Sequence, residues 1–439
     1  MTRLSIRQQI TLSVLWFSLN FETAALLPVV IPTQPLLFVT PGGVGNAQQA
    51  LVLGFLSAIG ALLALIIQPL TGMVSDRTAS RLGRRRPYIL VAAVIYVAGM
   101  LALAAAPGFA IFVIGFVLAQ IAANVGTASY QGLLPDRVPA DQRGTASGYL
   151  GLMTILGNVG SLVAAAVLLS NVRAGPGLAA AVRSGATRYY VLGIAVLVIG
   201  VLVTVVGIQE HSSNQPQPLG GGRPRVSQFF DLWLAPMRCG NFRWVFLTRA
   251  SVMLGLTIFL TYIEYYFANV AHVTNFVEST AAVALLALGG AVIGALTLGM
   301  VSDRIGRVGI VAVATGLMTL AALTFVVAPH IPLWPLGLLF GAGYGAYTSV
   351  DWALAVDSLP SLGAAGKDLG IWSIASNLPA VLAPLVGSLV IGGGTALGMT
   401  AEAAYRSVFA LAAGFLLLGA LFVFRVQETL PRPLRSAIS

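Results

Sequence analysis

Charged residues are scarce in this chain of 439 residues, where Asp, Glu, Lys and Arg together make up 9%. Soluble globular domains carry about 25% charged residues. The hydrophobic content of 57% and the mean hydropathy of +0.90 point the same way and exclude a water-soluble globular fold. The single cysteine, Cys239, excludes an internal disulfide framework.

Motifs for catalysis, nucleotide binding and metal binding are also missing. The sequence has no Walker loop and no nucleophile motif, and its three histidines lie far apart. We therefore expect neither an enzyme nor an ATP-driven pump, and no cofactor or bound metal. The net charge of +10 is explained by arginines in the cytoplasmic loops of a membrane protein, so no nucleic-acid partner is expected.

Long apolar runs dominate the chain instead. A helix that crosses a bilayer needs about 20 apolar residues, and such runs recur about a dozen times. Transmembrane helices are predicted at 8–33, 48–74, 87–106, 108–134, 144–170, 187–208, 241–270, 278–301, 307–328, 332–357, 367–392 and 404–425. The sequence thus predicts an all-α, multi-pass protein of the cell (inner) membrane, embedded in the lipid bilayer as a monomer.

The basic residues predict the orientation. Most of them fall in loops on one side of the predicted helices, and the other side receives only Arg173, Arg183, Arg188 and Arg406. Cytoplasmic loops carry the excess of Lys and Arg. Both termini are therefore predicted to lie in the cytoplasm.

The two halves of the chain resemble each other. GMVSDR at Gly72 recurs at Gly299, and VGSLV at Val159 recurs at Val386 with the same separation. A segment rich in Pro, Gly, Ser and Gln divides the halves. We predict an N-terminal six-helix bundle over 1–210, a cytoplasmic linker over 211–240, and a C-terminal six-helix bundle with a short tail over 241–439. Parallel repeats of this kind, with a binding site between them at mid-membrane, form one transporter architecture.

With these residues the chain resembles the major facilitator superfamily. That family carries a Gly-x-x-x-Asp-Arg motif after its second helix and a weaker copy after its eighth, fitted here by Gly72, Asp76, Arg77 and Gly83 and by Gly299, Asp303, Arg304, Gly306 and Arg307. The string SDRTASRLGRRRPYI is more specifically similar to the sucrose–proton symporters and the glycoside-, pentoside- and hexuronide-transporting relatives. The resemblance implies two parallel six-helix repeats, alternating access, and a small polar solute, a sugar or glycoside, moved with a proton or another cation.

One departure from that group concerns the coupling ion. The sugar–proton symporters place an acidic residue in the fourth helix, near Gln120 of this chain. An amide cannot carry a proton, so proton coupling requires another carboxylate. A proton-driven exporter of drugs or metabolites and a membrane sensor without flux remain the alternatives.

Ionisable residues within predicted helices are the functional candidates, because charges at membrane depth are costly. Glu22 lies about 18 Å along its helix, close to the midplane. We take it as the first proton-coupling carboxylate, the alternative being a hydrogen-bonded structural glutamate. Asp351, the second, can pair with Arg249 as a gate or as a scaffold. Glu264 is expected near the outer end of its helix.

Amides suit the hydroxyls of a sugar, and aromatic rings suit its apolar face. Gln120, Asn124 and Gln131 share one helical face and predict a polar stripe toward a cavity. For each aromatic residue the alternative is packing or interfacial anchoring. The predicted substrate-binding residues are Asn20, Gln120, Asn124, Gln131, Asn158, Tyr347, Trp352, Trp372 and Asn377.

The resemblance also implies a latch. Asp76 stands where the family uses a carboxylate to hold the cytoplasmic face closed, against the positive end of a neighbouring helix and an arginine such as Arg137 or Arg143. Topology signalling alone is the alternative role of the loop arginines. The predicted gating residues are Asp76, Arg77, Arg137, Arg249, Asp303 and Arg304.

Overall fold

The computed structural model describes residues 3–34, 46–170, 178–208, 235–271, 276–327 and 334–427. In these ranges the chain is helical and contains no strand. The first crossing is α1 (Ile6–Ala24), continued by a π-helical turn η1 (Leu26–Val30) and by α2 (Ile31–Thr33). The others are α4 (Asn46–Asp76), α5 (Arg86–Ala105), α6 (Phe109–Arg137), α7 (Arg143–Leu168), α8 (Leu178–Gly207), α10 (Gly240–Asn269), α11 (Phe276–Ile305), α12 (Arg307–Val327), α13 (Trp334–Asp357), α14 (Ala365–Ala396) and α15 (Ala401–Val423).

The predicted fold class is confirmed: over the described ranges these helices make twelve crossings in two sets of six. Nine of the described helices are individually long and apolar enough to span a bilayer, and the apolar stretch Ala282–Leu298 of α11 is shorter. The predicted linker falls mostly on residues 209–234, which lie outside the described ranges.

Local sequence signals explain where several helices begin. Ser5 starts α1 through a capping box, in which its hydroxyl accepts from the Gln8 amide at 3.3 Å and the Gln8 side chain accepts from the Ser5 amide at 2.9 Å. Gly83 has a φ of 93° in the loop before α5, and Gly306 has a φ of 103° at the matching place before α12. Because only glycine adopts this backbone shape readily, both copies of the repeated motif require it.

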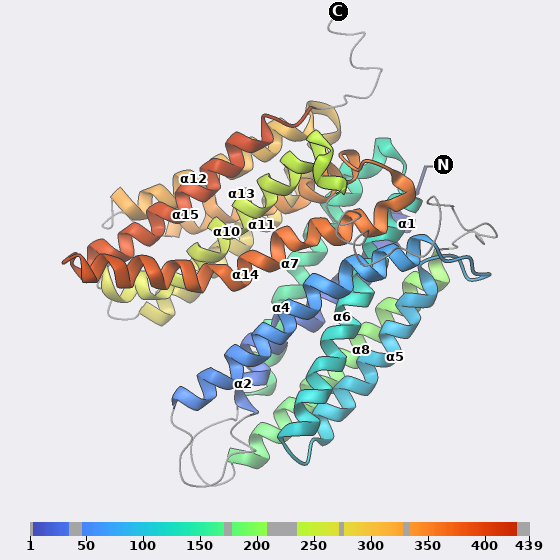
Figure 1. Ribbon diagram of the computed structural model, residues 1–439, viewed down its shortest axis with the longest axis horizontal. Helices are drawn as coiled ribbons and strands as arrows, with labels where there is room; N and C mark the ends of the chain where they lie inside the picture. Colours follow the sequence, from blue (N-terminus) through green and yellow to red (C-terminus); the bar gives the residue numbers. More distant parts are fainter. Residues whose placement is uncertain are drawn as a thin grey trace, which may run out of the picture.

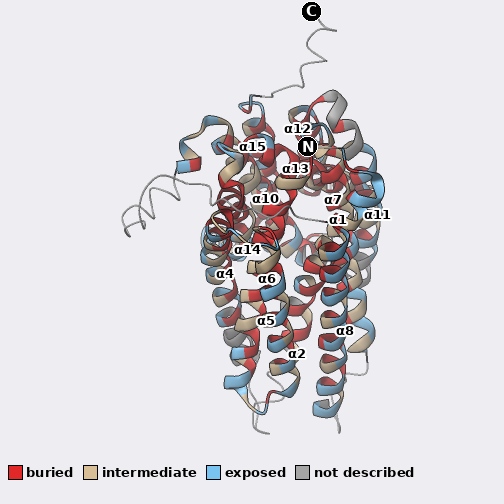
Figure 2. Ribbon diagram, turned by 90° about the vertical axis from the view of Figure 1, so that its right-hand side faces the viewer, coloured by how far each residue is buried: buried red, intermediate tan, exposed pale blue. Residues whose placement is uncertain are grey.

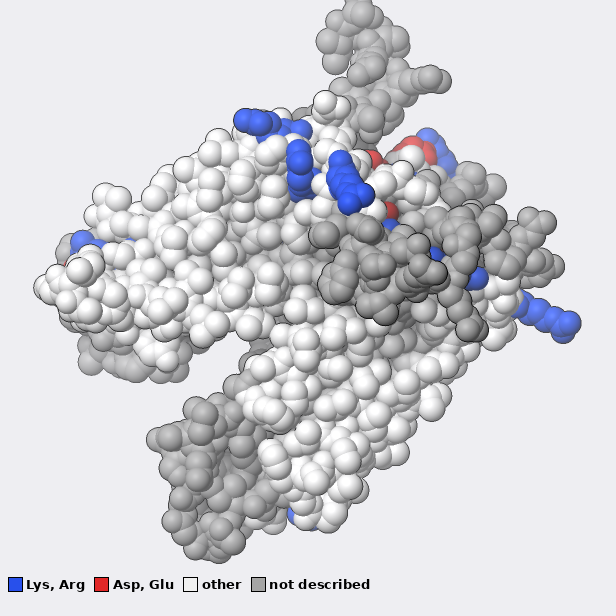
Figure 3. Space-filling view, in the orientation of Figure 1, with Lys and Arg blue, Asp and Glu red and all other residues white. Residues whose placement is uncertain are grey.

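The helices form two groups that meet at one end of the molecule and separate at the other (Figure 1). One group holds α1, α2 and α4 to α8, and the other holds α10 to α15. The N-terminus lies at the end where the groups meet, which we call the closed end. Figure 3 shows the wedge-shaped hollow between the groups, and the described flanks on this face carry almost no charge. Such flanks suit contact with lipid tails.

Close helix packing joins the two groups at the closed end. There α4 and α6 contact α14, and α7 contacts α11 and α13. Glycine makes the approach possible, because a Cβ at Gly151 would lie 2.9 Å from the Ser349 Cα and one at Gly370 would lie 2.7 Å from the Pro69 Cα. Figure 2 shows buried residues along the inner faces of the helices and exposed residues outside.

Candidate functional site

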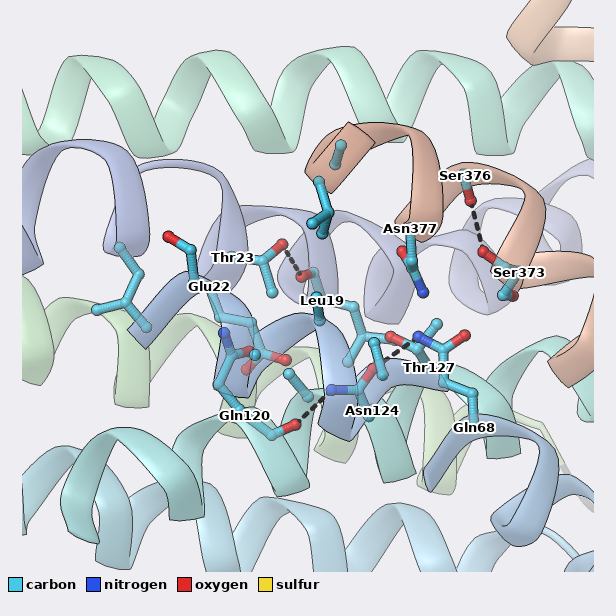
Figure 4. A pocket seen from close by; sticks show the side chains of 18 of the residues that line it. Leu19, Glu22, Thr23, Gln68, Gln120, Asn124, Thr127, Ser373, Ser376 and Asn377 are labelled. Atoms are coloured by element: carbon cyan, nitrogen blue, oxygen red, sulfur yellow. Dashed lines mark hydrogen bonds between the residues drawn. The ribbon is translucent and has the colours of Figure 1, made fainter. Parts of the chain in front are cut away.

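A cleft of about 850 Å³ lies between the two groups, lined by residues of α1, η1, α4, α5, α6, α10 and α14. Small side chains such as Ala58, Gly60 and Ala61 form much of the α4 wall. Polar side chains converge on it from both groups (Figure 4). Pockets for small ligands enclose about 300–1,000 Å³ and combine apolar walls with a few placed polar groups. The cleft fits that description.

Five of the predicted substrate-binding residues line this cleft, and four do not. The lining residues are Asn20, Gln120, Asn124, Gln131 and Asn377. Asn158, Tyr347, Trp352 and Trp372 are not part of the lining. Tyr347 and Trp372 instead lie behind it, against an ion pair described below.

Hydrogen bonds hold the amide stripe of α6 in place. The Asn124 Nδ2 donates to the Gln120 carbonyl at 2.7 Å, and its Oδ1 accepts from the Gln68 Nε2 at 2.7 Å. The Ser373 hydroxyl of α14 donates to the Gln131 Oε1 at 2.9 Å, which ties the two groups together. Gln68 was not among the predicted residues, although a lone amide within the apolar run IIQPL could have indicated it.

Two buried amide atoms in the cleft have no hydrogen-bond partner among the described residues. They are the Gln68 Oε1, an acceptor from α4, and the Asn377 Nδ2, a donor from α14. Buried polar groups in folded proteins are nearly always paired. A ligand that carries both hydroxyl donors and hydroxyl acceptors would satisfy these two atoms.

Trp16 supplies an aromatic surface that the sequence analysis did not select. Its ring stacks on Tyr130 with centroids 5.4 Å apart and an angle of 16° between the planes. Its Nε1 donates to the Thr154 Oγ1 at 2.8 Å. The indole lines the cleft, so these contacts fix a ring whose remaining surface can pack against the apolar face of a sugar.

Glu22 lines the same cleft from α1 and is 2% exposed. Its Oε2 has no hydrogen-bond partner among the described residues. Three residues later the helix widens into η1, where the Val30 amide donates to the Ala25 carbonyl at 3.0 Å. Such π-helical turns occur frequently at functional sites.

Arg249 and Asp351 form the expected ion pair between α10 and α13. The Tyr347 hydroxyl donates to the Asp351 Oδ1 at 3.0 Å, and the Arg249 Cζ lies 3.6 Å from the centroid of the Trp372 ring. Arg249 borders the cleft and donates to the Ser376 hydroxyl at 3.2 Å. Asp351 is thus already neutralised by a cation, whereas Glu22 is not.

At the closed end, Asp76 caps the N-terminus of α14. Its two carboxylate oxygens accept from the Gly366 amide at 3.0 Å and from the Lys367 amide at 2.9 Å. Its cationic partner is Arg85, which is fully buried. The Arg85 Nε also contacts the Asp136 Oδ2 at 3.2 Å. Burial lowers the pKa of Arg85, but the charges of Asp76 and Asp136 outweigh burial and raise it, so the guanidinium stays charged.

The arginine partner of this latch therefore differs from the expectation, which named Arg137 or Arg143. The Arg143 Nη1 instead donates to the Asp357 Oδ1 of the other group at 2.8 Å, and Asp357 also pairs with Arg307. At the closed end, Arg77 directly follows α4 and Arg137 is the last residue of α6. The side chains of Asp303, Arg304 and Glu264 lie outside the described part of the structure.

Two groups of long apolar helices with a cleft between them define a multi-pass α-helical membrane protein with the architecture of alternating-access carriers. The chain matches the Major Facilitator Superfamily over residues 23–366 and belongs to that family.

Curated relatives match parts of the chain. The general alpha-glucoside permease of Schizosaccharomyces pombe is 34% identical over 116 residues, which cover 23% of this chain and 21% of that protein. Sucrose transport protein SUC4 of Arabidopsis thaliana is 36% identical over 118 residues, 23% of each chain. The multi-drug resistance efflux pump PmrA of Streptococcus pneumoniae is 27% identical over 148 residues, 34% of this chain and 35% of that one. The first two alignments thus span about a fifth to a quarter of each relative.

Solved structures match over almost the entire length. FucP, a Major Facilitator Superfamily transporter in the outward conformation, gives a TM-score of 0.70 at 16% identity, with 94% of this chain and 98% of FucP covered. The proton:xylose symporter XylE gives a TM-score of 0.70 at 16% identity, with 96% of each chain covered. At this identity the likeness shows the fold alone.

Proposed function

We propose that this protein is a secondary active transporter that moves a sugar or glycoside together with a proton by alternating access. The position of Glu22 is the observation on which the proposal rests. Its buried Oε2 has no hydrogen-bond partner among the described residues, and it lines a cleft large enough for a sugar. The arginine of that cleft, Arg249, is already paired with Asp351. The partial matches to an alpha-glucoside permease and to a sucrose transport protein support the solute class.

The proposed membrane orientation follows from the charges. The closed end carries the N-terminus and the loop arginines, so it faces the cytoplasm and the cleft opens outward (Figure 1). We further propose that bundles 1–210 and 241–439 move as units in the cell membrane, joined by 211–240, and that one chain suffices for transport.

Coupling follows from the burial of Glu22. Taking a charged carboxyl out of water is costly, so the carrier closes over the cleft only when Glu22 is neutral, that is, protonated. Because their charges cancel, Arg249 and Asp351 can stay buried as an ion pair throughout the transport cycle. The proton therefore enters with the solute from the outside and leaves when the cytoplasmic end opens.

Replacing Gln68 with Leu is expected to weaken solute binding by about tenfold, because the cleft loses an unpaired acceptor and the support of Asn124. The half-saturating concentration in counterflow uptake measures the change. Gln34→Leu is the matched control, since Gln34 is a buried amide of the same group that does not line the cleft. Equal weakening in both variants would contradict the assignment.

Counterflow into proteoliposomes tests the proposed function. We expect vesicles preloaded with sucrose or an α-glucoside to take up the labelled solute transiently. A dye or drug that moves in its place would favour the exporter. The absence of flux for every solute would favour a sensor.

A further inference from the structure

Two buried polar groups from different helices line the same cleft. They are the Glu22 Oε2 of α1 and the Tyr96 hydroxyl of α5, on residues that are 2% and 1% exposed. Neither atom has a hydrogen-bond partner among the described residues. Both groups face the same segment of α8, because a Cβ at Gly193 would lie 3.1 Å from the Tyr96 hydroxyl, and Ser18, one turn before Glu22, donates to the Val196 carbonyl at 2.9 Å. Glu22 also lines a small pocket together with Ala92 and Ala93, one turn before Tyr96 on α5.

The other buried tyrosines of this helical group do not line the cleft. The Tyr189 hydroxyl of α8 shares a 2.7 Å hydrogen bond with the Ser161 hydroxyl of α7. The Tyr130 hydroxyl of α6 donates to the Leu12 carbonyl at 2.8 Å. Tyr190 of α8 is buried and is not part of the cleft lining.

The remaining polar surroundings carry little charge. Arg249 is the only other charged residue in the described lining of the cleft, and it pairs with Asp351. No cation of the described lining is therefore available to stabilise an ionised Glu22. A neutral donor must therefore stabilise the ionised carboxylate, and the Tyr96 hydroxyl is a buried donor of the lining that has no partner among the described residues.

We propose that Tyr96 is the positioning residue of the proton site, donating a hydrogen bond to ionised Glu22 directly or through one water. The inference rests on the proposed role of Glu22 in proton coupling. A hydrogen-bond donor that binds only the ionised carboxylate stabilises it relative to the protonated carboxyl. When a proton arrives from the outer solution, the carboxylate becomes a carboxyl and the Tyr96 hydroxyl is released. Tyr96 thereby sets the pH range over which the carrier loads its proton.

Infrared titration of the purified protein in lipid nanodiscs, without any solute, tests the proposal. The carboxyl band that disappears in Glu22→Gln belongs to Glu22, and its pH midpoint is the measured quantity. Removing the donor in Tyr96→Phe is expected to move the midpoint by about one pH unit to higher pH, a tenfold change in proton affinity. Tyr96→Met, which keeps the bulk without the hydroxyl, is expected to move it in the same direction.

Tyr190→Phe is the control, because it deletes an equally buried tyrosine hydroxyl on a residue that does not line the cleft. Its midpoint is expected to match the wild type. An unshifted midpoint in Tyr96→Phe, or an equal shift in Tyr190→Phe, would overturn the proposal. Because no solute is present, a failure of transport in vesicles would reject the proposed function and leave this titration to decide on Tyr96 separately.

Discussion

Glu22→Gln is expected to abolish proton-driven accumulation of the solute while sparing solute exchange. With one proton per solute, a gradient of one pH unit supports about tenfold accumulation in the wild type. Glutamine imitates the protonated carboxyl but cannot release a proton, so the variant should close over its solute in either direction. The internal and external solute concentrations should then become equal whatever the pH gradient.

The measurement is uptake of labelled solute into proteoliposomes with and without an acidic outside, together with exchange at equal pH. Glu402→Gln is the matched control, since the Glu402 side chain is 43% exposed and pairs with Arg406 one turn away. The control should accumulate solute as the wild type does. Proton-driven accumulation in Glu22→Gln would show that Glu22 does not couple transport to protons. Asp351 would then be the remaining predicted coupling residue.

Asp76→Asn is expected to open the closed end. The change removes the charge that pairs with the buried Arg85 and weakens the cap of α14. Breaking one partner of a buried ion pair costs about 3–5 kcal/mol, and Asp136 still compensates part of the Arg85 charge. A loss near 3 kcal/mol changes the ratio of two conformations by about a hundredfold. The conformation open to the cytoplasm should therefore gain population.

Spin labels on both sides of the closed end report this shift. Cysteines replacing the exposed residues Leu82 and Ser361, in a Cys239→Ser background, place one label on each group. The distance between them should increase in Asp76→Asn. Asp141→Asn is the control, because Asp141 is 45% exposed and pairs with Arg3 within one group. Equal distance distributions for Asp76→Asn and the wild type would contradict the latch.

The sequence was sufficient for the fold and for those cleft-lining residues whose place depends only on their position along one helix. Apolar runs and the repeated GMVSDR string predicted twelve helices in two halves. The depth of Glu22 and the spacing of Gln120, Asn124 and Gln131 were enough to select them, because helical periodicity determines which residues share a face.

Contacts between helices could not be predicted in the same way. The sequence does not show which arginine of the closed end pairs with Asp76. In the structure the partner is Arg85, which follows the turn at Gly83. Trp16 enters the site because Tyr130 and Thr154 on other helices orient its ring. Asn158 resembles the other amides in the sequence, yet α7 does not present it to the cleft.

Proton movement caused by the solute itself is the most direct test of coupled transport. A pH-sensitive dye inside proteoliposomes, prepared at equal pH on both sides, follows the lumen after a solute found by counterflow is added outside. The account predicts acidification of the lumen with the wild type and none with Glu22→Gln. Solute entry with an unchanged lumen pH, or with a lumen that becomes alkaline, would contradict it.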